Sequence, residues 1–131
     1  MKRNAIAIAA LLAGLGLLSG CDADYVRTMP IYDVELTAVS DGEHEGRFAY
    51  GGFTYVVLTT TRGHRIVKID LLKNRDERHA RQAEGVLPRV IEKQTPNVDA
   101  VTGATTTSKA LMKAVENSLT LRTATGGSGG S

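Results

Sequence analysis

The sequence predicts a small α+β fold, in which a short antiparallel sheet with a β-hairpin core packs against two or three helices. Residues 53–61 and 65–72 are rich in β-branched and aromatic side chains and are separated by the short turn Arg62-Gly63-His64, the pattern of a hairpin. Residues 108–121 carry apolar side chains at helical spacing. A length of 131 residues suits one domain.

Two further strands are expected before the hairpin. Residues 33–39 alternate between apolar and polar side chains, which predicts a half-buried strand. Residues 40–43 are typical of a turn, and residues 46–50 predict a second short strand that ends at Gly51-Gly52.

Three segments after the hairpin are candidates for helices. Residues 75–84 are charged with scattered alanines, which fits either a weak helix or a surface loop. Residues 87–94 predict a short helix with Pro88 in its first turn, where the missing N–H costs nothing. Residues 108–121 predict a longer helix, and its apolar face is expected to pack on the sheet. That face consists of Ala110, Leu111, Met112, Ala114, Val115 and Leu119.

The start of the chain has the pattern of an export signal. Residues 5–18 are apolar and uncharged, too short a run for the roughly 20 residues that span a bilayer, and they follow a short basic segment. Leu18-Ser19-Gly20-Cys21 resembles a bacterial lipobox, which implies cleavage after residue 20 and acylation of Cys21, the only cysteine. Residues 1–20 are therefore predicted to be a lipoprotein signal peptide and residues 21–32 a lipidated tether. The alternative is a plain secretory signal that ends near a cysteine.

Composition limits the kinds of partner and site. Of 16 Lys and Arg, Lys2 and Arg3 would leave with the signal, so 14 remain against 14 Asp and Glu. Such a neutral chain, without Trp, has no basic footprint for nucleic acid. The histidines His44, His64 and His79 are widely spaced and are interpreted as solvated loop residues. No carboxylate cluster has metal-ligand spacing, so no metal site is expected.

The segment of residues 99–108 is a glycine-containing, hydroxyl-rich loop that leads into the last predicted helix. A helix N-terminus favours a phosphate because its first N–H groups are unpaired and its dipole end is positive. Gly103 would let the backbone approach a ligand closely. Helix capping is an equally simple explanation of the composition, because Ser and Thr are common N-cap residues.

The order of residues in this loop resembles the flavinylation motif of FMN-binding domain proteins, Asp-x-x-[Ser/Thr]-Gly-Ala-[Thr/Ser]-x-[Thr/Ser]. That family includes the covalently flavinylated subunits of the sodium-pumping NADH:quinone reductase and of the Rnf complexes. Thr105 matches the flavinylated position. The other defined positions are matched by Asp99, Thr102, Gly103, Ala104 and Thr107.

The resemblance extends over residues 41–120. Asp41-Gly42-x-x-x-Gly46 is similar to the family's Asp-Gly-x-Tyr-x-Gly opening, with His44 in place of the aromatic residue. Arg62-Gly63-x-x-Ile66 is similar to the family's Asp-Gly-x-Ile turn, with Arg62 in place of the acid. Residues 33–121 are accordingly assigned to an FMN-binding domain and residues 122–131 to a flexible tail that resembles a linker.

The resemblance implies that FMN is joined covalently through its phosphate to Thr105. In this family a separate exported flavin transferase, which uses FAD and Mg²⁺, makes the bond, and the magnesium belongs to that enzyme. Asp99 would orient the acceptor hydroxyl or help the transferase to recognise the loop.

The implied function is that of an electron carrier, lipid-anchored on the extracytoplasmic (periplasmic) face of the cell membrane. It would relay electrons between a membrane donor and an external or periplasmic acceptor, both redox partner proteins. The alternatives are a small-molecule flavin reductase and a non-redox binding lipoprotein with an unmodified loop. The aromatic side chains of Tyr50, Phe53 and Tyr55 are expected in the core rather than near the flavin, and the charged residues 75–81 on a solvated face.

Overall fold

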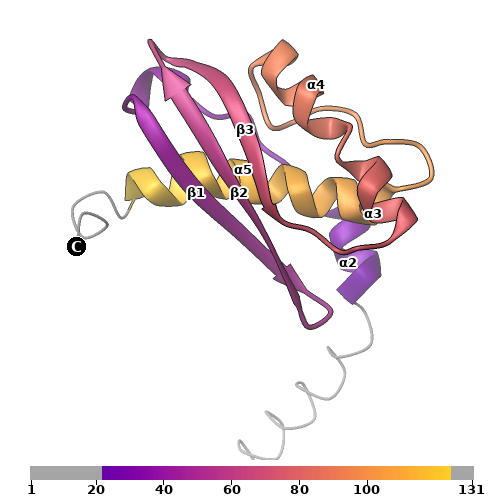
Figure 1. Cartoon of the computed structure of the whole chain (residues 1–131). Coiled ribbons are helices and arrows are strands. Elements are labelled where there is room, and N and C mark those ends of the chain that lie inside the picture. The colour runs from indigo at the N-terminus through magenta and orange to yellow at the C-terminus, as the bar shows by residue number, and fades with distance from the viewer. Residues whose placement is uncertain (1–21, 125–131) are drawn as a thin grey trace, which may run out of the picture.

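A three-stranded antiparallel sheet forms one layer of the fold and helices form the other (Figure 1). The structure is a computed structural model that describes residues 22–124. The elements in chain order are α2 (Asp22–Thr28), a 3-10 turn (Leu36–Ala38), β1 (Gly42–Tyr50), β2 (Phe53–Arg62), β3 (Arg65–Lys73), α3 (Arg78–Ala83), α4 (Val86–Lys93) and α5 (Thr105–Ala124). The prediction of an α+β fold with a small antiparallel sheet is confirmed.

Two tight turns connect the strands, which lie in the order β1-β2-β3. Arg62 pairs with Arg65 across the two-residue turn Gly63-His64, so the predicted hairpin is confirmed. Both turn residues have positive φ, as do Gly51 and Gly52 in the turn between β1 and β2. Such turns match the right-handed twist of the flanking strands, and they fix the register of the sheet.

The long helix α5 covers one face of the sheet along β1 and β2 (Figure 1). All six residues of its predicted apolar face are buried, which confirms that face. They meet the fully buried Tyr55 and Val57 of β2, and the hydroxyl of Ser118 donates a 2.8 Å hydrogen bond to Thr59. The helix begins at Thr105, three residues earlier than predicted, and it continues to Ala124. Residues 122–124 are therefore helical and not tail, while residues 125–131 lie outside the described part.

The strand predicted at residues 33–39 is wrong. The segment contains the 3-10 turn Leu36–Ala38, in which backbone N–H groups bond to carbonyls three residues back instead of to a neighbouring strand. Its apolar residues still pack on the core, since Val39 is buried and Val34 and Leu36 are half-buried. Alternation predicted the inward packing of Val34 and Leu36 but not the exposure of Ala38 or the burial of Val39, which it placed on the opposite face. The strand that does form, β1, has β2 as its partner and begins at Gly42, inside the predicted turn.

The expectation of a tether at residues 21–32 is also wrong for the described residues. Residues 22–28 form helix α2, and the side chains of Val26, Met29 and Ile31 are 0%, 3% and 5% exposed in the core. Each such side chain contributes about 1.5–3 kcal/mol on burial. The packing is not evident from the sequence because the charged, exposed residues Asp24 and Arg27 flank the buried Val26. Residues 1–21 lie outside the described part, so the signal peptide and the acylation of Cys21 stay predictions.

Helix α4 packs on the core through the buried Val86, Leu87 and Val90, and the side chain of Gln94 links its end to the edge of the sheet. Gln94, in the left-handed conformation that ends α4, accepts a 2.8 Å hydrogen bond from the N–H of Ile66 and donates one of 2.9 Å to its carbonyl. The amide thus pairs with β3 as a neighbouring strand would. Pro88 lies in the first turn of α4 as predicted, and residues 78–83 of the ambiguous charged segment form helix α3. The loop after α4 is thereby positioned beside the first turn of α5.

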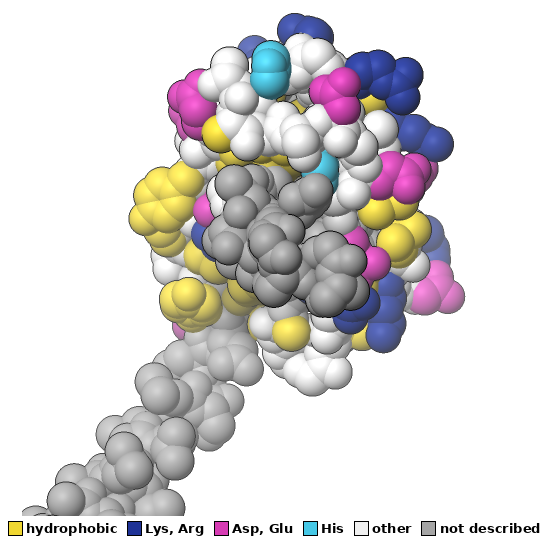
Figure 2. All heavy atoms as spheres, turned by 90° about the vertical axis from the view of Figure 1, so that its left-hand side faces the viewer, with side chains coloured by type: hydrophobic (Ala, Val, Ile, Leu, Met, Phe, Trp, Pro, Cys, Tyr) yellow, Lys and Arg dark blue, Asp and Glu magenta, His cyan; other side chains and the backbone are white. Residues whose placement is uncertain are grey.

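The surface mixes charge types and carries few large apolar side chains. Figure 2 shows hydrophobic side chains mainly on one side of the face that it presents, with Lys and Arg mainly on the other. Among the residues that the structure describes, the exposed large hydrophobic ones are Tyr25, Tyr32, Val67 and Leu72. None of the helices in the described range 22–124 is long and apolar enough to cross a membrane.

Candidate functional site

The threonine-rich loop folds back on the first turn of α5. The N–H of Val101 donates a 3.1 Å hydrogen bond to the hydroxyl of Ser108, and the N–H of Ala104 donates one of 3.0 Å to the carbonyl of Val101. Gly103 lies between them with φ of +82°, a conformation that side chains rarely adopt. These contacts fix residues 101–108 as a compact turn, so the hydroxyls of the motif have defined positions.

Burial separates the hydroxyl groups of the motif. Thr107 is 8% exposed and Ser108 is fully buried, whereas Thr102 and Thr105 are exposed and Thr106 is half-buried. Helix capping does not account for the exposed threonines, because Ala104 precedes the helix and has no side-chain acceptor. The motif therefore presents the hydroxyls of Thr102, Thr105 and Thr106 to an incoming reagent.

Thr105 is the first residue of α5, a helix of 20 residues. The first N–H groups of a helix have no intrahelical partners, and the aligned peptide dipoles place partial positive charge there. A phosphate on the Thr105 hydroxyl would meet both features without any further cation. Ala104, only 5% exposed, packs into the core directly before it.

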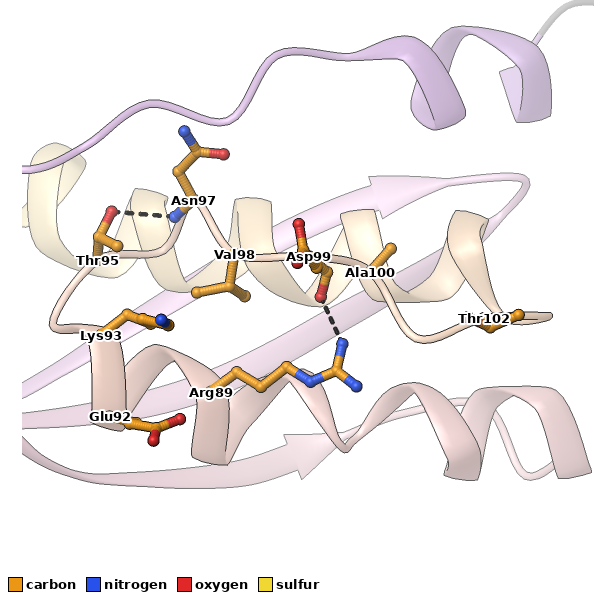
Figure 3. Close-up of a pocket in the computed structure, with 9 residues that line it drawn as sticks. All are labelled: Arg89, Glu92, Lys93, Thr95, Asn97, Val98, Asp99, Ala100 and Thr102. Atoms are coloured by element: carbon orange, nitrogen blue, oxygen red, sulfur yellow. Dashed lines mark hydrogen bonds between the residues drawn. The ribbon is translucent and has the colours of Figure 1, made fainter.

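A groove of about 520 Å³ opens between α4 and the loop that carries the motif (Figure 3). This volume lies within the roughly 300–1,000 Å³ range of cofactor sites. Its lining residues come from α4 and from the following loop. They are Arg89, Glu92, Lys93, Thr95, Asn97, Val98, Asp99, Ala100 and Thr102. The groove thus adjoins the motif directly and has room for a flavin.

Arg89 is the cation nearest the motif within this groove. Its guanidinium donates a 2.8 Å hydrogen bond to the backbone carbonyl of Asp99, and the Asp99 carboxylate points away from it (Figure 3). Arg89 therefore holds the loop through its backbone, and its positive charge is not paired with the Asp99 carboxylate. Sequence reasoning missed Arg89, because residues 87–94 predict only a packing helix. Its role depends on how α4 lies against the loop.

A cluster of three aromatic rings and one arginine lies near the turn between β1 and β2. Tyr50 stacks on Tyr55 at 5.7 Å between ring centroids, and Phe53 meets Tyr55 edge-on at 4.9 Å. The Arg75 guanidinium lies 4.8 Å from the Phe53 ring centroid, and its Nε donates a 2.7 Å hydrogen bond to the hydroxyl of Tyr55. Tyr55 is fully buried, as expected of a core residue, whereas Tyr50 and Phe53 are half-buried. The prediction of a solvated face is wrong for Arg75, which packs on these rings.

The aromatic cluster is linked to the motif by a hydrogen bond between Tyr50 and Thr107, which affects the pKa of Tyr50. Burial, followed by the hydrogen bond and charge of Tyr55, raises the pKa of Tyr50 to about 12, while the Arg75 charge and a hydrogen bond with the Thr107 hydroxyl act in the opposite direction. The hydrogen bond to Tyr55 is the largest cause that raises the pKa of Arg75. Thr107 thus turns inward to the aromatic cluster, while Thr105 faces outward.

The comparison with known families agrees with this geometry. The sequence model of the FMN-binding domain family matches residues 49–120, more than half of the 131 residues. The chain belongs to the FMN-binding domain family. The matched range runs from the end of β1 to Thr120 within α5 and includes the whole motif, but it begins after the segment of residues 41–46. A comparison with curated protein sequences finds no match.

Family membership supports FMN as the ligand of this domain, and the residues fit that ligand. The helix N-terminus suits the phosphate, and the adjoining groove has the volume of a cofactor site. Within residues 22–124, no group of three or more His, Cys, Asp or Glu side chains could hold a metal ion.

His44 of this FMN-binding domain is not the solvated loop residue that the sequence predicts. It lies on β1, is 1% exposed, and its Nε2 donates a 2.8 Å hydrogen bond to the carbonyl of Ser40. In the described chain, its Nδ1 atom is buried without a hydrogen-bond partner. The early start of β1 is the reason, because it places His44 within the strand at a buried position of the sheet. His64 and His79 are exposed, as predicted.

The raised pKa of Tyr50 predicts that the FMN-binding domain loses stability at high pH. Tyrosine in an unfolded chain ionises near pH 10, whereas folded Tyr50 keeps its proton to about pH 12. The unfolded state therefore loses a proton first, and the stabilisation present below about pH 10 disappears as the pH rises toward about 12. Since the ring is half-buried, solvent screening reduces this effect to about 1 kcal/mol.

Urea unfolding at about pH 9 and about pH 11.5 measures this loss. Tyr50→Phe should remove this part of the pH dependence, whereas Tyr25→Phe, at an exposed tyrosine, should retain it. An equal loss of stability in wild type and Tyr50→Phe would contradict the assignment to Tyr50.

Proposed function

We propose that this domain carries FMN covalently, through a phosphoester to Thr105, and works as an electron-transfer lipoprotein outside the cytoplasm. The observation that carries the proposal is the exposure of Thr105, the first residue of α5, inside an intact flavinylation motif. Thr107 and Ser108 of the same motif are buried and serve the fold. An acceptor hydroxyl must be reachable by the enzyme that modifies it, and Thr105 is an exposed residue of the motif.

The residues around Thr105 fit the parts of FMN. The N–H groups at the start of α5 would hold the phosphate, and the groove beside Asp99 and Thr102 would take the remainder of the molecule. Arg89 would supply positive charge there. FMN brings the ability to accept and donate one or two electrons, and the protein supplies its placement and surroundings.

Asp99 is proposed to act in recognition by the flavin transferase. Its side chain is exposed, and no hydrogen bond joins its carboxylate to Thr105 among the described residues. The transferase would take FMN from FAD with Mg²⁺, join it to the Thr105 hydroxyl and release AMP. The exposed loop of residues 99–105 is the surface that such an enzyme can reach.

Covalent attachment suits a protein anchored by Cys21 on the extracytoplasmic face of the membrane. A dissociating flavin would be lost there, because no pool replaces it. A bonded flavin can instead pass electrons repeatedly from a membrane donor to an external or periplasmic acceptor protein.

The proposal is tested by expressing the full chain with and without a flavin transferase. With the transferase, the intact mass should increase by one FMN less one water, and membrane-extracted protein should show a flavin spectrum that dithionite bleaches and an added electron acceptor restores. The chain made without the transferase is the control and should lack the increase. An unmodified mass despite the transferase would overturn covalent attachment. Steady turnover of a small-molecule oxidant would instead favour the reductase alternative.

A further inference from the structure

Helix α2 begins directly after the cysteine that is proposed to be acylated, and it is part of the folded domain. It starts at Asp22, and its residue Val26 and the following Met29 are 0% and 3% exposed. The Nζ of Lys109 on α5 donates a 2.6 Å hydrogen bond to the carbonyl of Met29. With no spacer between residue 21 and this docked helix, an anchor at Cys21 would bring the domain itself to the bilayer.

The residue best placed to meet the bilayer is Tyr25, whose side chain is 63% exposed. It is the fourth residue of α2, about 4.5 Å along the helix axis from Asp22, the residue that follows Cys21 in the sequence. The polar layer on each side of the hydrocarbon core is about 5–8 Å thick, and tyrosine is enriched in that layer. Asp24 and Arg27 beside it form an ion pair of 4.0 Å, so their charges largely offset each other.

We propose that α2 is a membrane seat: residues 22–28 lie in the lipid headgroup layer with the Tyr25 ring among the headgroups, and they hold the domain in a fixed orientation. The occupant of this surface is the lipid bilayer. This inference rests on the proposed acylation of Cys21 and adds to it that the anchor works without a flexible tether.

The seat would also place the candidate FMN site near the membrane. Lys109, which contacts Met29, lies four residues after Thr105 on α5, about 6 Å along the helix axis. Figure 1 shows α2 beside the end of α5 at which that helix begins. The electron donor that fits this arrangement is one embedded in the membrane, since a donor there meets the site without any movement of the domain.

Single-tryptophan variants test the seat, because the chain has no Trp. Tyr25→Trp reports on the seat. Val67→Trp is the matched control, since Val67 is 48% exposed and follows the turn between β2 and β3, which Figure 1 places at the end of the sheet away from α2. The full chain is exported and acylated without the flavin transferase, so that no flavin absorbs the emission. It is then reconstituted in phosphatidylcholine vesicles that contain headgroup-labelled quencher lipid.

We expect quenching of Tyr25→Trp to exceed that of Val67→Trp several-fold. Insertion of about twelve Gly and Ser residues between Cys21 and Asp22 should reduce the difference, because the domain could then leave the surface. Equal quenching of an acylated Tyr25→Trp and Val67→Trp would overturn the seat and leave covalent flavinylation untouched. An intact mass without acyl chains would overturn both the anchor and the seat.

Discussion

Replacing Thr105 with valine is expected to abolish covalent flavin binding completely while leaving the fold intact. Valine keeps the shape of threonine and removes only the hydroxyl that would form the phosphoester. Because Thr105 is exposed on the first turn of α5, its side chain contributes little to packing. The cost in stability should therefore stay within about 0.5 kcal/mol, as for most surface substitutions.

The matched controls are Thr102→Val and Thr106→Val, which remove the two other accessible hydroxyls of the motif. Each chain is co-expressed with a flavin transferase and analysed by peptide mass spectrometry and by flavin fluorescence after a denaturing gel. Both controls should retain flavin on the peptide that contains Thr105. Flavin on the Thr105→Val chain, or its loss from Thr102→Val alone, would move the attachment site away from Thr105.

The parts of the fold that the sequence predicts are those governed by local patterns. The hairpin turn at Gly63-His64 depends on two residues, and the buried face of α5 repeats with the period of the helix, so both were predicted correctly. The start of α5 was predicted three residues late, because three consecutive threonines have low helix propensity. Burial of Thr107 and Ser108 in the core overrides that preference.

The parts that the sequence does not predict depend on contacts between distant segments. No pattern in the sequence around Val26 indicates that this residue packs into the core beside α5, so the segment of α2 was predicted to be a tether. In the sequence, Arg75 is the first residue of a charged run that is expected to be solvated. In the structure, the strands β1 and β2 place three aromatic rings against its guanidinium. The same holds for the candidate site: the motif is visible in the sequence, whereas the groove and Arg89 arise from the packing of α4 against the loop.

Replacing Gly46 with alanine is expected to destabilise the domain more than the same added methyl group at Gly52 does. A Cβ at Gly46 would lie 2.5 Å from the backbone N of Ser118 and 2.6 Å from its Cβ, and closer still to the carbonyl oxygen of Ala114. These are mostly backbone atoms of α5, so no change of side-chain rotamer relieves the clash. Overpacking of a core typically costs about 1–3 kcal/mol, and a clash with rigid backbone should reach or exceed about 3 kcal/mol.

Gly52→Ala is the matched control, because an added Cβ there meets nothing within 4 Å and only the positive φ of +76° opposes it. That strain costs about 1–2 kcal/mol. Thermal unfolding of both chains without flavin separates the effects, since about 3 kcal/mol lowers the melting temperature of a domain near 100 residues by roughly 12 °C or more. Equal melting temperatures for Gly46→Ala and Gly52→Ala would contradict the close approach of β1 to α5. A larger fall for Gly46→Ala would explain a glycine at this position physically, since only a residue without a side chain lets the sheet lie directly on the helix that carries Thr105.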